Sequence, residues 1–405
     1  MNDREKAGRK STATGTQRMS DQCFVQEADL DIDRFRKICD QQTDLSDYPL
    51  ASEIRHDVVI YDAQAFDRAI GSVEAETELK SELHRCLLDG PGVLAVRNAF
   101  ANSDIVDDAT AVYRTIIADE RSTAEHRGDH FARPGENERI WNALQKLCER
   151  APETFVNYYS NPVLGLVSES WLGPNYQVTS QVNIVKPGGA AQQAHRDYHL
   201  GFQNNSVVAR YPVSVQVASQ FLTLQGAVAH TDMSIASGPT KVLPYSQQYA
   251  AGYLAWRDHR FRSYYEQQCI QIPLKKGDAI FFSPALFHSA GSNTETTDRV
   301  ANLLQVSVAF GKTMESVDWT RIAQLAYAVL LKKQRQSVLS TNDVRWLMGS
   351  TADGYAFPTN LDTDPPVEES APMNAQELLQ QSLEDELTVD EFTMLLTETI
   401  GRRRA

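Results

Sequence analysis

The sequence predicts a mainly β protein with flanking helices, an α+β fold. Between residues 176 and 312, short β-rich runs follow one another without helical patterns between them, which indicates an antiparallel sandwich or barrel. Helical periodicity precedes this region and returns after residue 313. A chain of 405 residues can bury a large core, so it needs no disulfides for stability.

The first elements are a helix and a short strand. Leu79, Leu83 and Leu87 recur at four-residue spacing and predict a helix over 76–88. A Gly-Pro-Gly sequence then breaks the chain, and the apolar run 93–96 predicts a strand.

A long polar stretch follows, from residue 119 to residue 138, between helices predicted over 111–117 and 140–148. Long loops in compact enzymes are often lids over a binding site. We therefore expect residues 127–133 of this stretch to lie near substrate.

The β-rich region contains six predicted strands separated by Gly, Pro and Asn turn signals. They cover residues 176–185, 213–217, 221–229, 271–274, 279–282 and 300–310. The absence of helical patterns between most of these runs excludes a doubly wound parallel sheet.

The C-terminal part is predicted to be helical, with a helix over 319–333, a Pro-rich acidic connector over 358–372 and two short amphipathic helices. Their apolar faces carry Leu378, Leu379 and Leu383 in one helix, and Phe392, Leu395, Leu396 and Ile400 in the other. These faces either pack on the main body or mediate self-association as a homo-oligomer. The predicted division is a disordered tail (1–20), a catalytic-type domain (21–330) and a helical acidic extension (331–405).

Charge and cysteine content limit the classes of partner. The net charge of −14 argues against nucleic acid or an anionic membrane as a partner, and no apolar run is long enough to span a membrane. The five cysteines are scattered and form no Cys-x-x-Cys pair, as expected of reduced thiols in the cytoplasm. The N-terminal residues lack the apolar segment of a secretory signal.

Candidate metal ligands are found in a His-x-Asp pattern that occurs twice, at His195/Asp197 and at His230/Asp232. A third element, His288, follows a buried-looking strand, and Arg299 begins the next strand. Two imidazoles and one carboxylate on a β scaffold are the ligand set of non-haem Fe(II) oxygenases. A nearby arginine would bind an acidic co-substrate through two hydrogen bonds. The alternative is that these side chains only satisfy β-turns.

At these residues the chain resembles the phytanoyl-CoA dioxygenase (PhyH-like) family of Fe(II)/2-oxoglutarate-dependent oxygenases, from about residue 78 to residue 312. The resemblance rests on a series of short matches in the family's order. They are Gly90-Pro91-Gly92-Val93-Leu94, Arg139-Ile140-Trp141-Asn142, Val182-Asn183-Ile184-Val185-Lys186-Pro187-Gly188, His195-Arg196-Asp197-Tyr198, Ser237-Gly238-Pro239-Thr240, Leu243-Pro244-Tyr245-Ser246, and Gly277-Asp278 with His288, Asn293 and Arg299.

The resemblance implies a double-stranded β-helix core and an oxygenase that uses Fe(II), 2-oxoglutarate and O2. It implies that His195, Asp197 and His288 ligate iron, and that Arg299, with Asn183, binds 2-oxoglutarate. Because halogenating relatives have a small residue in place of the carboxylate, Asp197 implies hydroxylation or another C–H oxidation.

The expected substrate is a small metabolite or natural-product intermediate. Candidate contacts to the substrate are Tyr198, His199, Arg210 and His230. The alternative for each is a structural role or a solvent-exposed position without a function. The competing function is a catalytically silent metal-binding barrel that acts as an interaction protein through its acidic tail.

Overall fold

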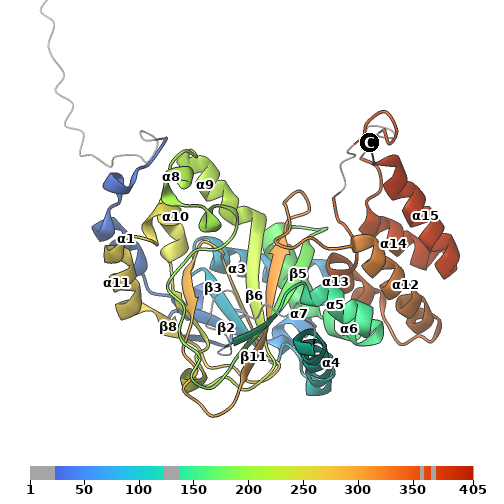
Figure 1. Ribbon diagram of the computed structural model, residues 1–405, viewed down its shortest axis with the longest axis horizontal. Helices are drawn as coiled ribbons and strands as arrows, with labels where there is room; N and C mark the ends of the chain where they lie inside the picture. The colour runs from blue at the N-terminus through green and yellow to red at the C-terminus, as the bar shows by residue number, and fades with distance from the viewer. Residues whose placement is uncertain (1–22, 123–136, 356–359, 366–370, 405) are drawn as a thin grey trace, which may run out of the picture.

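A computed structural model describes residues 23–122, 137–355, 360–365 and 371–404 (Figure 1). Two β-sheets form its centre. Eight strands pair in the order β1-β2-β3-β9-β6-β11-β5-β4, and three pair in the order β10-β7-β8. All neighbours are antiparallel except β2 and β3. The strands are β1 (Glu53–Arg55), β2 (Val58–Asp62), β3 (Val93–Arg97), β4 (Asn137–Ile140), β5 (Gln177–Val185), β6 (Thr223–Ala229), β7 (Thr240–Leu243), β8 (Ile270–Gln271), β9 (Ala279–Phe282), β10 (Phe287–Ala290) and β11 (Arg299–Ser307).

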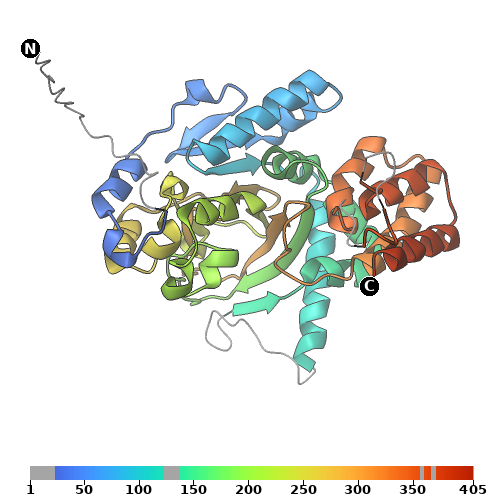
Figure 2. The same ribbon diagram turned by 90° about the horizontal axis from the view of Figure 1, so that it is seen from above.

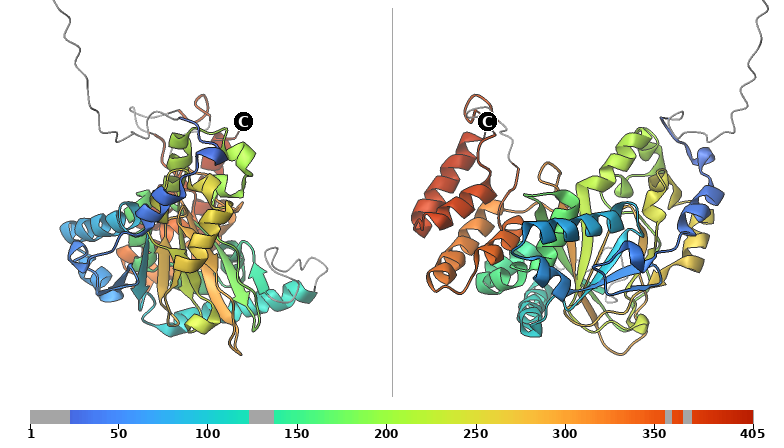
Figure 3. Two further views of the ribbon diagram at one scale, coloured as in Figure 1. Left: turned by 90° about the vertical axis from the view of Figure 1, so that its left-hand side faces the viewer. Right: turned by 180° about the vertical axis from the view of Figure 1, so that it is seen from behind.

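Helices surround the sheets, and the last four helices form a separate group. They are α1 (Ile32–Cys39), α2 (Ala63–Ala69), α3 (Val73–Leu88), α4 (Ser103–Ser122), α5 (Ala143–Arg150), α6 (Pro152–Tyr159), α7 (Pro162–Leu172), α8 (Asn205–Val208), α9 (Val213–Ser219), α10 (Gly252–Ala255), α11 (His259–Gln268), α12 (Trp319–Arg335), α13 (Thr341–Thr351), α14 (Ala375–Glu384) and α15 (Val389–Arg402). Helices α12 to α15 lie at one end of the β core, and α1 and α8 to α11 lie at the other (Figure 1). The view from above and the view from behind show the same arrangement (Figures 2 and 3).

Alternation along the strands separates two apolar cores. In β9, Ala279 and Phe281 face the helices on the outer side of the large sheet, whereas Ile280 and Phe282 face the space between the sheets. This alternation follows from the two-residue period of a strand. Each sheet residue is therefore assigned to one face, and the inner face can be followed along every strand.

The inner face changes from apolar to polar across the large sheet. Strand β5 is buried throughout, and its Val178, Val182 and Ile184 belong to the outer core. The alternate positions, which include Gln181 and Asn183, therefore point between the sheets. Buried amides need hydrogen-bond partners, so a polar inner face is expected only where a site lies.

The predicted α+β class with a double-stranded β-helix core and outer helices is confirmed by the two facing sheets. One predicted strand is wrong: residues 213–217 form helix α9. Pro212 supplies the N-cap, and the buried residues Val213 and Gln216 lie three apart, which is helical spacing. The alternation Val-Ser-Val-Gln-Val in the sequence suited either structure.

Other predicted boundaries differ from the observed ones because the helices and strands are longer or shorter than their sequence patterns. The predicted helix 111–117 is the middle of α4, which extends to Ser122, while Ile140 ends a strand and the next helix begins at Ala143. Of the predicted strand 271–274, only Gln271 belongs to β8. The predicted lid residues 127–133 and the tail 1–20 lie outside the described residues.

The two C-terminal helices pack on the body of the chain, as the first of the two alternatives predicted. Leu379, Leu383, Phe392 and Leu396 are buried in the main core, and the Phe392 ring stacks on Tyr327 of α12 at 4.0 Å. The Thr388/Glu391 capping box starts α15 as expected. These four apolar side chains are therefore buried within one chain. Among the described residues, no helix has the length and apolarity needed to cross a membrane.

Candidate metal centre and cavity

The two candidate histidines are brought together by backbone pairing across 93 residues of sequence. His288 lies on β10, and His195 forms an antiparallel bridge with it. The His195 N–H donates to the His288 carbonyl oxygen at 3.0 Å, and the His288 N–H donates to that of His195 at 3.2 Å. The Asp197 N–H then donates to the Pro284 carbonyl oxygen. The second sheet therefore places all three side chains at one point.

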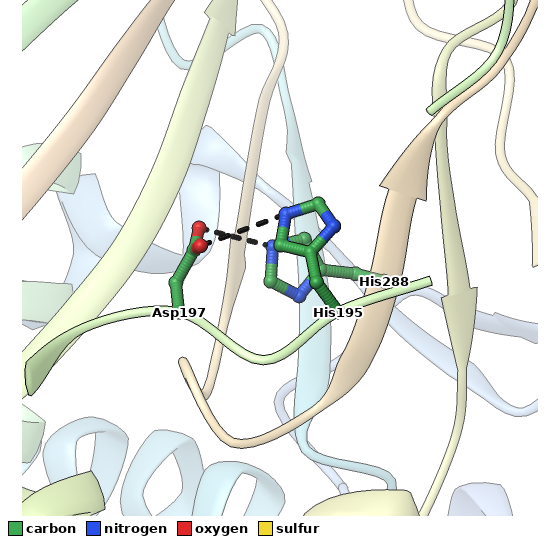
Figure 4. A group of neighbouring side chains, drawn as sticks. All are labelled: His195, Asp197 and His288. Carbon is green, nitrogen blue, oxygen red and sulfur yellow. Dashed lines mark hydrogen bonds and ion pairs between the residues drawn. The ribbon is translucent and has the colours of Figure 1, made fainter. Parts of the chain in front are cut away.

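The three side chains converge on a common centre (Figure 4). The Asp197 carboxylate oxygens lie 3.5 Å from His195 Nε2 and 3.3 Å from His288 Nε2. The Nδ1 atoms of the two rings lie 2.8 Å from the carbonyl oxygens of Gln193 and Leu286. Because a carbonyl oxygen only accepts, both Nδ1 atoms donate, which leaves the Nε2 atom of each ring facing the Asp197 carboxylate and able to bind a metal once it carries no proton. This donor set fits a divalent metal such as Fe(II).

The local environment shifts the pKa values of Asp197 and His195 towards the forms that bind a metal. Burial would raise the pKa of the Asp197 carboxyl, but the two imidazoles and a hydrogen bond from Gln225 outweigh it and hold that pKa well below its usual range. Burial lowers the pKa of His195. An ionised carboxylate and neutral imidazoles are the ligand forms.

Arg196, between the two candidate ligands in sequence, anchors their segment to the protein. Its guanidinium donates to the backbone oxygens of Ser246 and Tyr249, and it stacks over the Tyr253 and Phe287 rings at 5.3 and 5.2 Å. A Cβ atom at Gly252 would overlap this guanidinium, so only glycine allows the close approach. This buried anchor fixes the backbone between His195 and Asp197.

Arg299 and Asn183 lie side by side on β11 and β5. The buried Arg299 guanidinium donates to the Gly238 carbonyl oxygen and, at 3.1 Å, to Asn183 Oδ1. Burial and the nearby Arg139 lower the pKa of Arg299 to about 10, and its Nε–H has no partner among the described residues. A buried cation with an unused donor fits the distal carboxylate of 2-oxoglutarate.

A cavity of about 580 Å³ joins these two groups. Asp197, His195, His288, Arg299 and Asn183 all lie in its wall. This volume falls within the range of about 300–1,000 Å³ that is usual for small-molecule sites. The cavity can therefore hold a co-substrate and a small substrate beside the metal centre.

Sequence reasoning missed several residues of the cavity wall. Gln225 donates to the Asp197 carboxylate, and Arg139 donates to the buried Gln181. Two tryptophans, Trp141 and Trp256, line the cavity as well. The alternate polar residues of β5 were the signal that this strand faces a site.

The four candidate substrate contacts are not among the residues that line the cavity in the described part of the chain: Tyr198, His199, Arg210 and His230. Tyr198 and His199 take positive φ angles of 63° and 37°, and this turn carries the chain away from Asp197. Arg210 is exposed. The predicted substrate contacts therefore lie outside the cavity wall in the described structure.

His230 belongs instead to a buried hydrogen-bond network. The Thr110 hydroxyl donates to the Val106 carbonyl oxygen, so it must accept from His230 Nδ1, 2.7 Å away. The Nε2 atom then accepts from the Tyr158 hydroxyl at 2.8 Å, and Asn302 donates to that hydroxyl. A neutral imidazole satisfies both ring nitrogens together with the Thr110 and Tyr158 hydroxyls, as expected of a structural residue.

This network predicts a pH-dependent stability. Burial lowers the pKa of His230 from its ordinary 6.5 to about 3. Below pH 6.5 the unfolded chain takes up a proton that the folded chain does not. We therefore expect His230 to make the free energy of unfolding fall by about 1.4 kcal/mol per pH unit as the pH drops from 6.5 towards 3.

Urea denaturation at pH 7 and pH 5 measures this effect. His230→Gln is expected to be less stable at pH 7 and to lose the corresponding part of the pH dependence, with iron binding unchanged. An unaltered pH dependence in the variant would contradict the assignment.

A double-stranded β-helix with two imidazoles and one carboxylate at a cavity, and a buried arginine in the same wall, is the architecture of Fe(II)/2-oxoglutarate-dependent oxygenases. The sequence profile of the phytanoyl-CoA dioxygenase (PhyH) family matches residues 77–301, and the chain belongs to this family. It is an iron- and 2-oxoglutarate-dependent dioxygenase with O2 as its oxidant.

Three of the solved structures that match the chain do so at low sequence identity. The non-haem α-ketoglutarate-dependent carbocyclase SnoK from nogalamycin biosynthesis is 16% identical, with 65% of this chain and 92% of that chain covered and a TM-score of 0.43. AviO1 from Streptomyces viridochromogenes Tue57 is 15% identical (55% and 92% covered, TM-score 0.40). HygX from Streptomyces hygroscopicus, with nickel and 2-oxoglutarate bound, is 14% identical (57% and 89%, TM-score 0.37). No curated protein matches the chain.

Proposed function

We propose that this oxygenase hydroxylates, or otherwise oxidises at a C–H bond, a small metabolite or natural-product intermediate. The observation that carries the proposal is the convergence of His195, Asp197 and His288 in the wall of a 580 Å³ cavity that also contains Arg299. In this proposal the first three residues hold Fe(II). Arg299 and Asn183 hold 2-oxoglutarate.

Each of these residues contributes to binding the metal or the co-substrate. The carbonyl oxygens that accept from Nδ1 of His195 and His288 fix both rings with Nε2 towards the centre. Gln225 holds one Asp197 oxygen in place. The buried Arg299 orients a dicarboxylate by a charge-assisted hydrogen bond. When bound, Fe(II) and 2-oxoglutarate supply the activation of O2, with release of succinate and CO2 and oxidation of a C–H bond.

Asp197 supports hydroxylation over halogenation, since a carboxylate fills the position that halogenating relatives leave vacant. The five cysteines are free, which supports the cytoplasm as its location.

Succinate formation tests the proposal. The iron-loaded protein is incubated under air with 2-oxoglutarate and fractionated metabolite pools, and succinate is measured against a no-pool control. We expect at least one fraction to raise succinate formation, together with a product heavier by one oxygen or lighter by two hydrogens. Iron binding without succinate from any broad pool would favour the silent interaction protein instead.

A further inference from the structure

The cavity is positively charged although the chain carries a net charge of −14. Its wall contains the arginines Arg139, Arg196, Arg257 and Arg299, whereas Asp197 is the one acidic residue among the described residues that line it. Arg299 is assigned to 2-oxoglutarate in the proposed function. A cavity lined by one sign of charge concentrates ligands of the opposite sign.

At the cavity wall, Arg257 has no acidic partner among the described residues. Its guanidinium carbon lies 3.8 Å from the centre of the Trp256 ring, and both residues line the cavity. It donates to the Gly201 carbonyl oxygen at 2.9 Å, to Asn205 Oδ1 at 3.2 Å and to the Tyr253 carbonyl oxygen at 3.5 Å. These acceptors are neutral and use three of its five N–H groups.

A second arginine, Arg262, adds positive charge next to Arg257. Arg262 donates to the Trp256 carbonyl oxygen and to Gln193 Oε1, and Gln193 lines the cavity. Within the described part of the chain, neither Arg257 nor Arg262 forms an ion pair. Burial and the charge of Arg262 both lower the pKa of Arg257. An anion bound there would neutralise a repulsion between Arg257 and Arg262 that no ion pair of either arginine relieves in the described structure.

We propose that the substrate of this oxygenase carries an oxyanion, a carboxylate or a phosphate ester, which binds Arg257. This inference rests on the proposed function and assigns the chemical class of its substrate. A guanidinium presents paired N–H groups that match either oxyanion. The apolar side chains of Phe202, Trp256, Phe282 and Leu303 in the same wall would contact an apolar body.

The competing role for Arg257 is structural, because its bond to Gly201 holds the short 3-10 turn His199–Phe202 that follows Asp197. A structural role would affect charged and neutral ligands equally. The test therefore compares ligands that differ only in charge.

The experiment uses the full chain with Fe(II) and 2-oxoglutarate under anaerobic conditions, where ligand binding beside the metal perturbs its visible absorption band. The probes are aryl and alicyclic carboxylic acids, aryl phosphate monoesters and the primary amides of the same acids. We expect the oxyanions to bind about 10- to 100-fold more tightly than the amides, as is typical of a hydrogen bond to a charged group. The acid and phosphate arms identify which oxyanion is preferred.

Variants assign the preference to Arg257. Arg257→Gln is expected to remove the difference between acids and amides, with 2-oxoglutarate affinity retained. Arg260→Gln is the matched control, since Arg260 is exposed and paired with Asp258. Equal binding of acids and amides, no binding of any oxyanion at millimolar concentration, or a preference that persists in Arg257→Gln would each overturn the inference. Absence of the absorption band itself would overturn the proposed function, and this inference with it.

Discussion

Replacing Asp197 by alanine is expected to abolish succinate formation and to lower Fe(II) affinity by more than about 100-fold. The loss of groups that merely support metal ligands typically costs 10- to 100-fold, and a ligand should cost more. Asp197 is the sole carboxylate within reach of the two imidazoles in the described structure. Its removal leaves two facing histidine rings without an anion, and equilibrium dialysis of Fe(II) measures the effect.

Asp232 provides the matched control, because it occupies the same place in the second His-x-Asp pattern. Its carboxylate is 64% exposed and pairs with Lys275, and Asp232 is not among the residues that line the cavity. Asp232→Ala is expected to leave iron binding and stability nearly unchanged, as is usual for an exposed ion pair. Loss of iron in Asp232→Ala alone would reverse the ligand assignment.

Replacing Arg299 by glutamine is expected to weaken 2-oxoglutarate binding by roughly 30- to 1,000-fold, while Fe(II) affinity changes little. The guanidinium is buried, and removing one partner of a buried hydrogen-bonded charge pair costs about 2–4 kcal/mol. Titration of 2-oxoglutarate into the anaerobic iron-loaded protein measures the constant. The effect should appear in the KM for 2-oxoglutarate as well.

Two comparisons separate this role from a general loss of structure. Arg299→Lys keeps a charge but loses the paired donors, so its affinity should fall between those of the parent and the glutamine variant. Arg210→Gln, an exposed arginine on the same chain, should bind 2-oxoglutarate normally. Unchanged 2-oxoglutarate affinity in Arg299→Gln would show that another group holds the co-substrate.

The fold could be predicted where local pattern and burial agree. The apolar run of β9 and the four-residue spacing in α3 both describe elements whose burial follows the sequence period. Residues 213–217 show the opposite case, since five alternating residues suit a strand or a single helical face. Packing decided between them, and packing is not visible in a short window.

The centre of the site was predictable because metal ligation restricts residue types. Only His, Cys, Asp and Glu side chains serve as common ligands of a non-haem iron, so His195, Asp197 and His288 stand out in the sequence. The cavity wall has no such restriction. Gln225 and the adjacent pair Trp256 and Arg257 came from two separate segments of ordinary composition, and only the packing of the fold brought them to one wall.

Anaerobic absorption spectroscopy tests the central claim most directly, namely that His195, Asp197 and His288 form one iron site next to a 2-oxoglutarate site. We predict a weak visible charge-transfer band that requires both Fe(II) and 2-oxoglutarate, saturates at one iron per chain and disappears in His288→Ala. A parent protein that shows no band when both are added, or a His288→Ala variant that keeps the full band, would contradict the claim.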